Sequence, residues 1–131
     1  MTEPIWIGQK GTLLLHERLL VQHGGAAGLR DEGLLSSALA RPMQHAVFSE
    51  AAELVYLAAL YTDGIVKNHP FIDGSKRTGF ILGVLFLELN GYRFTASQET
   101  AANAVIMLAA GDVDVGGYAD FLAANSHLAR S

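Results

Sequence analysis

The residues best suited to chemistry lie in one short stretch, from His69 to Gly79. It contains an imidazole at His69, a carboxylate at Asp73 and two cationic side chains at Lys76 and Arg77, between two apolar segments. An imidazole can accept a proton near neutral pH, and a carboxylate can hold a hard cation such as Mg²⁺ on phosphate oxygens. The stretch therefore combines groups suited to a base, a metal and an anion.

The elements on either side must place these groups together. Pro70 disfavours helical geometry at His69, so we expect the preceding helix to end at or before Asn68. The next helix should begin near Gly74, with Asp73 at or beside its N-cap.

The start of that second helix predicts an anion site. The backbone N–H groups of Gly74, Ser75 and Lys76 would be first-turn donors at the positive end of the helix dipole. Lys76 and Arg77 would add positive charge, and His69 would lie one short loop upstream. An ordinary turn with solvated cations is the alternative, because His-Pro and Asp-Gly are common turn dipeptides.

Size and composition indicate one globular domain, residues 1–131. The chain lacks cysteine, which excludes disulfides and thiolate metal sites. The longest apolar run, Phe80 to Leu87, is shorter than the roughly 20 residues that span a bilayer. The N-terminus lacks the layout of a secretory signal. These features predict a cytoplasmic protein without a membrane segment.

The net charge of −4 argues against direct nucleic-acid binding, because no basic stripe could repay contacts with a phosphate backbone. Positive charge is concentrated locally at Lys67, Lys76 and Arg77. A small anionic ligand suits this distribution better than a nucleic acid.

Apolar spacing and capping residues predict an all-α fold of about six helices, with at most a short β flap or strap. Glu3 to Gly11 is expected to be extended, either as a strap packed on the domain or as a flap that lines a substrate groove. Tyr92 to Thr95 is expected to be briefly extended. The expected helices run from Thr12 to about His23, from Asp31 to near Arg41, from Ser49 to Asn68, from Gly74 to Asn90, from Ser97 to Gly111, and onward from Asp114.

Several positions carry more specific expectations. Pro42 should end the second helix, which leaves residues 42–48 as a connection. Ser49 should cap the next helix, with Glu50 near its positive end. Residues 80–89, apolar almost all round, should form a central helix surrounded by others. Gly79 and Gly83 should allow a neighbouring backbone or a ligand to approach closely. The remaining histidines should be surface or capped residues; they are His16, His23, His45 and His127. Four residues of the fifth helix should face inward, namely Ala102, Val105, Ile106 and Ala109.

Residues 69–79 resemble the signature of the Fic/Doc superfamily, a loop of the form H-P-F-x-D/E-G-N-G/K-R before a buried helix. Lys76 matches the Doc (death-on-curing) type, since adenylyl-transferring Fic proteins usually have glycine there, and Phe80 stands where they usually have a second arginine. Ser75 departs from the usual asparagine. Residues 28–42 resemble the upstream part of Doc-type toxins, so the likeness extends over nearly the whole chain.

The resemblance implies a compact Fic/Doc helix bundle and the toxin component of a type II toxin–antitoxin system. It would be an ATP-dependent protein kinase that uses Mg²⁺ and phosphorylates a hydroxyl on a translation factor similar to elongation factor Tu. In that scheme His69 takes the proton from the acceptor hydroxyl and Asp73 positions Mg²⁺.

The resemblance also assigns the other loop residues. Gly74 and Ser75 would donate backbone N–H groups to the phosphates of ATP, while Lys76 and Arg77 would bind ATP and stabilise the charge that develops during transfer. Protein adenylylation is one alternative reaction. An inactive domain kept for binding is another, because the hydroxyl of Ser75 is shorter than an amide and has one donor instead of two.

Regulation is expected to come from another chain. Self-inhibited Fic proteins carry an S/T-x-x-x-E-G/N helix, and the nearest approach here, residues 95–100, fails at its last position. The resemblance implies a cognate antitoxin protein that docks against the toxin.

Overall fold

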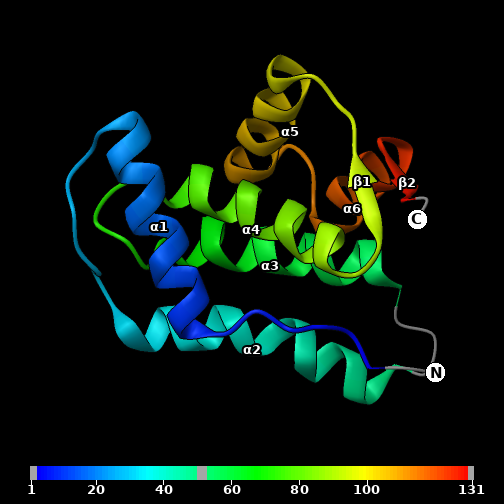
Figure 1. Ribbon diagram of the computed structural model, residues 1–131, viewed down its shortest axis with the longest axis horizontal. Helices are drawn as coiled ribbons and strands as arrows, with labels where there is room; N and C mark the ends of the chain where they lie inside the picture. Colours follow the sequence, from blue (N-terminus) through cyan, green and yellow to red (C-terminus); the bar gives the residue numbers. More distant parts are fainter. Residues whose placement is uncertain (1–2, 50–52, 130–131) are drawn as a thin grey trace.

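The computed structural model describes residues 3–49 and 53–129, which form six helices and a small sheet (Figure 1). The predicted all-α class is confirmed. The helices are α1 (Gln9–His23), α2 (Glu32–Phe48), α3 (Leu54–Asn68), α4 (Ser75–Leu89), α5 (Gln98–Ala110) and α6 (Val115–Ala124). None of these helices has both the length and the apolar character needed to cross a bilayer.

Helix α3 is the most enclosed element of the bundle. Every residue from 57 to 66 is buried, and α2, α4 and α6 all pack on this helix. Residues 80–89 were expected to be the central helix, but several side chains of α4 are only partly buried. Figure 1 shows α3 and α4 side by side, with α1 crossing them near the loop that joins the two.

The expected close approach at Gly79 and Gly83 is confirmed as helix packing. A Cβ atom on Gly83 would collide with the side-chain oxygen of Thr62 and would lie 2.9 Å from the carbonyl oxygen of Ala58. The Thr62 hydroxyl donates a hydrogen bond of 2.7 Å to the carbonyl oxygen of Gly79. Small residues on α4 therefore bring its backbone directly against α3.

The N-terminal segment packs on the domain as a strap, which confirms the first of the two expectations for it. The backbone N–H of Ile7 donates to the Tyr61 hydroxyl at 3.0 Å, and that hydroxyl donates to the Ile7 carbonyl at 3.2 Å. Burial raises the pKa of Tyr61, so the hydroxyl keeps the proton that this second bond needs. Trp6 packs on Phe86, and α1 begins at Gln9, before the expected Thr12.

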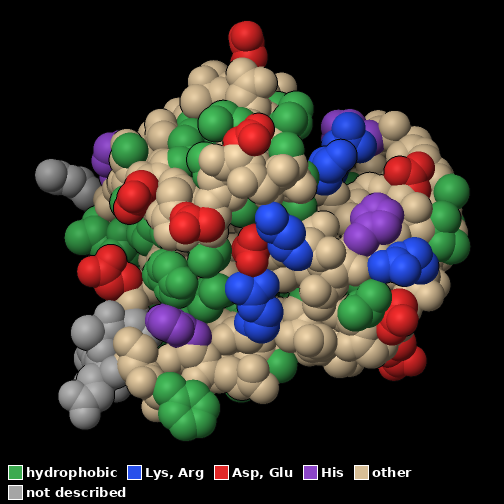
Figure 2. All heavy atoms as spheres, turned by 180° about the vertical axis from the view of Figure 1, so that it is seen from behind, with side chains coloured by type: hydrophobic (Ala, Val, Ile, Leu, Met, Phe, Trp, Pro, Cys, Tyr) green, Lys and Arg blue, Asp and Glu red, His purple; other side chains and the backbone are tan. Residues whose placement is uncertain are grey.

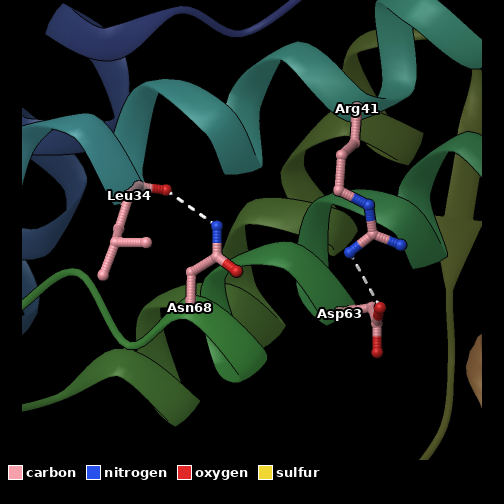
Figure 3. Close-up of polar contacts among 4 residues, drawn as sticks. All are labelled: Leu34, Arg41, Asp63 and Asn68. Atoms are coloured by element: carbon pink, nitrogen blue, oxygen red, sulfur yellow. Dashed lines mark hydrogen bonds and ion pairs between the residues drawn. The ribbon is translucent and has the colours of Figure 1, made fainter.

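The expectation that Pro42 ends the second helix is wrong, because α2 continues through it to Phe48. Proline lacks the N–H that would bond to the carbonyl of Ala38. That carbonyl lies against Gly64 of α3, where a Cβ atom would be 3.2 Å away. Pro42 itself is buried, and Arg41 forms an ion pair of 2.8 Å with Asp63 (Figure 3). Packing against α3 thus stabilises α2 at the proline.

The expected cap at Ser49 is also wrong. Ser49 is the extended C-cap residue of α2, and α3 begins only at Leu54, with Glu53 as its N-cap. Because α2 runs on to Phe48, Ser49 ends that helix and cannot cap the next one. The role expected for Glu50 lies outside the described residues.

Three other predicted caps are confirmed. The side chains of Asp31, Ser97 and Asp114 each accept a hydrogen bond from a backbone N–H in the first turn of α2, α5 and α6 respectively. Each bond satisfies one donor that lacks a partner within the helix. These helix starts are fixed by local chemistry.

The predicted inward face of α5 differs from the observed face by a rotation of about one residue. Ala101, Val105 and Leu108 are buried, whereas Ala102 and Ile106 are exposed. Both sets have helical spacing and share Val105, so periodicity alone does not separate them. Contacts with α3, α4 and α6 select the observed face.

The two strands form one small antiparallel sheet. Strand β1 (Tyr92–Phe94) was expected, and it pairs with β2 (Ser126–Leu128), which was not. Tyr92 lies opposite Leu128, and Phe94 lies opposite Ser126. The segment of β2 is short and without an alternating pattern, so its strand geometry depends on the distant partner.

We expect Gly83→Ala to destabilise the protein by about 1–3 kcal/mol, because the new Cβ would force α3 and α4 apart. Gly11→Ala is the matched control, since Gly11 is an exposed helical residue and its added Cβ would be 3.4 Å from the Ile7 side chain. That change should be neutral or stabilising by up to about 1 kcal/mol. Urea unfolding measures both, and equal stability of the two variants would contradict the packing described here.

Candidate functional site

The loop that joins α3 to α4 is left-handed at both ends. As predicted, α3 ends at Asn68, and His69 follows as its C-cap with φ 49° and ψ 58°. Among residues 3–49 and 53–129, His69 is the one non-glycine residue with positive φ. Gly74, with φ 81°, is the N-cap of α4, so Asp73 lies beside the N-cap as expected. The His69 side chain is exposed.

The loop lies antiparallel along the segment that precedes α2. The backbone N–H of Arg30 donates to the Pro70 carbonyl at 2.6 Å, and that of Ile72 donates to the Gly28 carbonyl at 3.1 Å. Phe71 is fully buried in the core. The loop is therefore fixed by backbone bonds on one side and by an apolar anchor on the other.

Asp73 has two backbone donors. Its Oδ1 accepts the N–H of Gly74 at 2.8 Å, and its Oδ2 accepts the N–H of Ala26 at 3.1 Å. A carboxylate has about four acceptor positions, so each oxygen keeps one for a cation. The exposed, pre-oriented carboxylate has the oxygen ligands that a hard cation such as Mg²⁺ prefers. No group of three or more His, Cys, Asp or Glu residues within the described ranges could hold a metal by itself.

The first turn of α4 differs in one respect from the expectation. The N–H of Gly74 bonds to Asp73, which leaves Ser75 and Lys76 to supply the expected backbone donors. Lys76 and Arg77 are both exposed on this turn. Positive side chains and the positive end of the helix dipole thus occur together.

The side chain of Ser75 is directed to the interior. It is only 2% exposed, and within the described structure its hydroxyl has no hydrogen-bond partner. Of the polar groups of Ser75, the backbone N–H is the one placed to contact a ligand at the helix start.

Two side chains missed in the sequence contact this loop, and the first is His16. It was expected at the surface, but it is 5% exposed and stacks on Phe71, with ring centroids 3.8 Å apart and planes 8° from parallel. Its Nε2 lies 2.7 Å from the carbonyl oxygen of Asp73. The spacing of Thr12, His16 and Leu19 on one helix face was a signal that it is buried. The other three histidines are exposed or half-buried.

Arg30 is the second. Its Nε donates to the carbonyl oxygen of His69 at 2.7 Å, and its Nη2 donates to that of Asn68 at 2.8 Å. Asn68 in turn donates to the Leu34 carbonyl at 2.9 Å (Figure 3). Nothing in the local sequence pairs Arg30 with a helix end about forty residues away, so no local rule could have found this contact.

Basic and acidic side chains are interspersed on the face shown in Figure 2, which has no continuous basic surface. This distribution agrees with the net charge of −4. It suits a compact anionic ligand at one helix start better than an extended polyanion.

We expect Gly25→Ala to disturb Asp73 selectively. A Cβ atom on Gly25 would lie 2.8 Å from Asp73 Oδ2, whereas one on Gly24 would meet nothing within 4 Å. Both glycines have positive φ, 79° at Gly24 and 122° at Gly25, so Gly24→Ala also strains the backbone but causes no collision. Backbone amide chemical shifts of Ala26 and Gly74, measured by NMR, should change more in Gly25→Ala, and equal changes in the two variants would contradict this geometry.

Comparisons with known proteins assign this chain to a family. A model of the Fic/DOC family matches residues 6–87, more than half of the chain and all of the loop. The chain is 28% identical to protein kinase doc of Escherichia phage P1 over 116 residues, or 88% of this chain and 91% of that protein. It is 32% identical to Toxin Doc of Mycolicibacterium smegmatis over 80 residues, or 60% of this chain and 62% of that protein. The chain belongs to the Fic/DOC family.

Proposed function

We propose that this protein is an ATP-dependent protein kinase of the Doc type and the toxin of a toxin–antitoxin pair. Its acceptor would be a hydroxyl on a translation factor similar to elongation factor Tu. The observation that carries this proposal is the position of His69 and Asp73 on one short, fixed loop that ends at the cationic first turn of α4. The similarity to a protein named protein kinase doc supports the choice of reaction.

The phosphates of ATP would bind at the start of α4. The backbone N–H groups of Ser75 and Lys76 belong to the first turn of a helix, where they have no carbonyl partner within the helix, and the side chains of Lys76 and Arg77 are exposed beside them. These groups would neutralise the charge on the transferred phosphate without rearranging during the reaction. When bound, Mg²⁺ would supply further neutralisation, and Asp73 would hold it.

His69 would act as the general base. It would accept the proton of the acceptor hydroxyl as that oxygen bonds to the terminal phosphorus of ATP and ADP leaves. Its exposed side chain suits contact with a protein substrate, and its backbone is fixed by the end of α3. Alignment of the base with the acceptor hydroxyl is a large part of the catalysis that a protein supplies to phosphoryl transfer.

Phosphate transfer is favoured over adenylyl transfer by two positions. Lys76 stands where adenylyl-transferring relatives usually have glycine, and Phe80 stands where they usually have a second arginine. Phe80 is half-buried and packs edge-to-face on Phe94, with ring centroids 5.8 Å apart. That position therefore serves the core and brings no second cation to the loop.

We expect a phosphate-sized mass on the acceptor protein after incubation with ATP and Mg²⁺. Elongation factor Tu is the first acceptor to test, by mass spectrometry of the intact protein. His69→Ala should abolish the addition, whereas His127→Ala, a change at an exposed histidine on β2, should leave it intact. A nucleotide-sized addition would instead establish adenylylation and refute the kinase proposal.

Binding of ATP and Mg²⁺, measured by calorimetry, separates an active site from a degenerate one. The degenerate alternative arises from Ser75, but its hydroxyl is buried, so Ser75→Ala should bind ATP as the unchanged protein does. Arg77→Ala should lose binding, because it removes an exposed cation from the helix start. Absence of ATP binding to the unchanged protein would refute the kinase proposal and favour an inert binding domain.

A cognate antitoxin follows from the toxin proposal and from the failed self-inhibitory motif at residues 95–100. We expect expression of this protein alone to stop bacterial growth, and co-expression of the protein from the neighbouring reading frame to restore it. His69→Ala should permit growth without the partner. Normal growth of cells that express the unchanged protein at a verified level would contradict both toxicity and the need for a partner.

A further inference from the structure

The loop from His69 to Gly74 contacts two side chains from elsewhere in the fold, one at each end. Arg30 bonds to the end that carries His69, and His16 bonds to the end that leads into α4. We propose that these are positioning residues with separate tasks: Arg30 fixes the proton acceptor, and His16 fixes the phosphate-binding helix start. The kinetic part of this proposal rests on the function proposed above.

Arg30 holds the end of α3 through two bonds from one guanidinium group. The carbonyls of Asn68 and His69 are at a helix C-terminus, where they have no donor within the helix. Arg30 donates to both, at 2.8 and 2.7 Å, and its backbone N–H donates to the Pro70 carbonyl at 2.6 Å. The three consecutive carbonyl groups of Asn68, His69 and Pro70 therefore all accept hydrogen bonds from Arg30, and these bonds fix the left-handed turn at His69.

Lysine could not do this. A guanidinium group presents several N–H donors in a rigid planar fork, whereas an ammonium is a single charge on a flexible stem. The two carbonyls that Arg30 contacts belong to consecutive residues, so the fork fixes the orientation of the peptide between Asn68 and His69. Rotation of that peptide would move the His69 side chain.

His16 acts at the other end of the loop. A carbonyl oxygen only accepts hydrogen bonds, so Nε2 of His16 must carry the proton that it donates to Asp73. The same ring stacks flat on Phe71, and a Cβ atom on Gly74 would lie 3.6 Å from Nε2. The imidazole thus fixes the peptide that leads into the first turn of α4, whose N–H groups would contact phosphate.

Arg30 variants should lower turnover and leave ATP affinity intact. A small displacement of a catalytic group can cost on the order of a hundredfold in rate. We expect Arg30→Met to reduce kcat by tenfold to about a hundredfold, with little change in the Kd for ATP, and Arg30→Lys to recover less than a third of the loss. Arg93→Met, at an exposed arginine on β1, is the matched control and should change neither value.

His16 variants should instead weaken ATP binding. His16→Phe keeps a flat ring against Phe71 but removes the donor, so the Kd for ATP should rise at least several-fold. His16→Gln keeps a terminal N–H donor and should restore most of the affinity. His127→Phe, at an exposed histidine on β2, is the control. If His16→Phe lowers kcat with an unchanged Kd, or if Arg30→Met raises the Kd as much as it lowers kcat, the division of tasks is refuted.

A measurement on the free protein tests the geometry without any activity. Backbone amide resonances followed by NMR should shift at His69 and Phe71 in Arg30→Met and at residues 73–75 in His16→Phe. Unchanged resonances in both regions would refute the positioning roles even in an active enzyme. If these shifts are present but the unchanged protein neither binds ATP nor transfers phosphate, the proposed function is refuted and the positioning roles are not.

Discussion

The close approach of α3 and α4 is the constraint on which the rest of the structure depends. Gly79 and Gly83 bring the backbone of α4 against Ala58 and Thr62, so the two helices pack closely side by side. Helix α3 must end where the loop begins, and α4 must start within six residues. His69 at one helix end and the first turn of the next helix are consequently neighbours.

The two helix ends beside the loop are treated differently. The carbonyls at the C-terminus of α3 receive the Arg30 guanidinium, so that end is satisfied within the chain. The first turn of α4 has only the N–H of Gly74 bonded, to Asp73, and carries the exposed cations of Lys76 and Arg77. This asymmetry suits the proposed arrangement of an anionic ligand at one end and a fixed base at the other, because the backbone donors of Ser75 and Lys76 stay available to an anion.

The sequence rules failed where a distant contact outweighed a local preference. Proline usually ends a helix, but Pro42 is buried and contacts with α3 stabilise α2 around it. Serine is a common N-cap residue, but Ser49 is the C-cap residue of α2. The face of α5 and the existence of β2 depended on partners far along the chain, and spacing within a short segment carries no information about them.

The sequence by itself determined the six helices, most of their ends and the chemistry of the loop, because caps, glycines and the His69-Pro70 dipeptide act through bonds within a few residues. It also determined family membership through the same loop. Only the tertiary structure decided that Ser75 turns its hydroxyl inward, that Asp73 is oriented by Ala26, and that His16 and Arg30 fix the two ends of the loop. These contacts join segments that are distant in the chain, and packing of α1 and α2 around the joined ends of α3 and α4 brings them together.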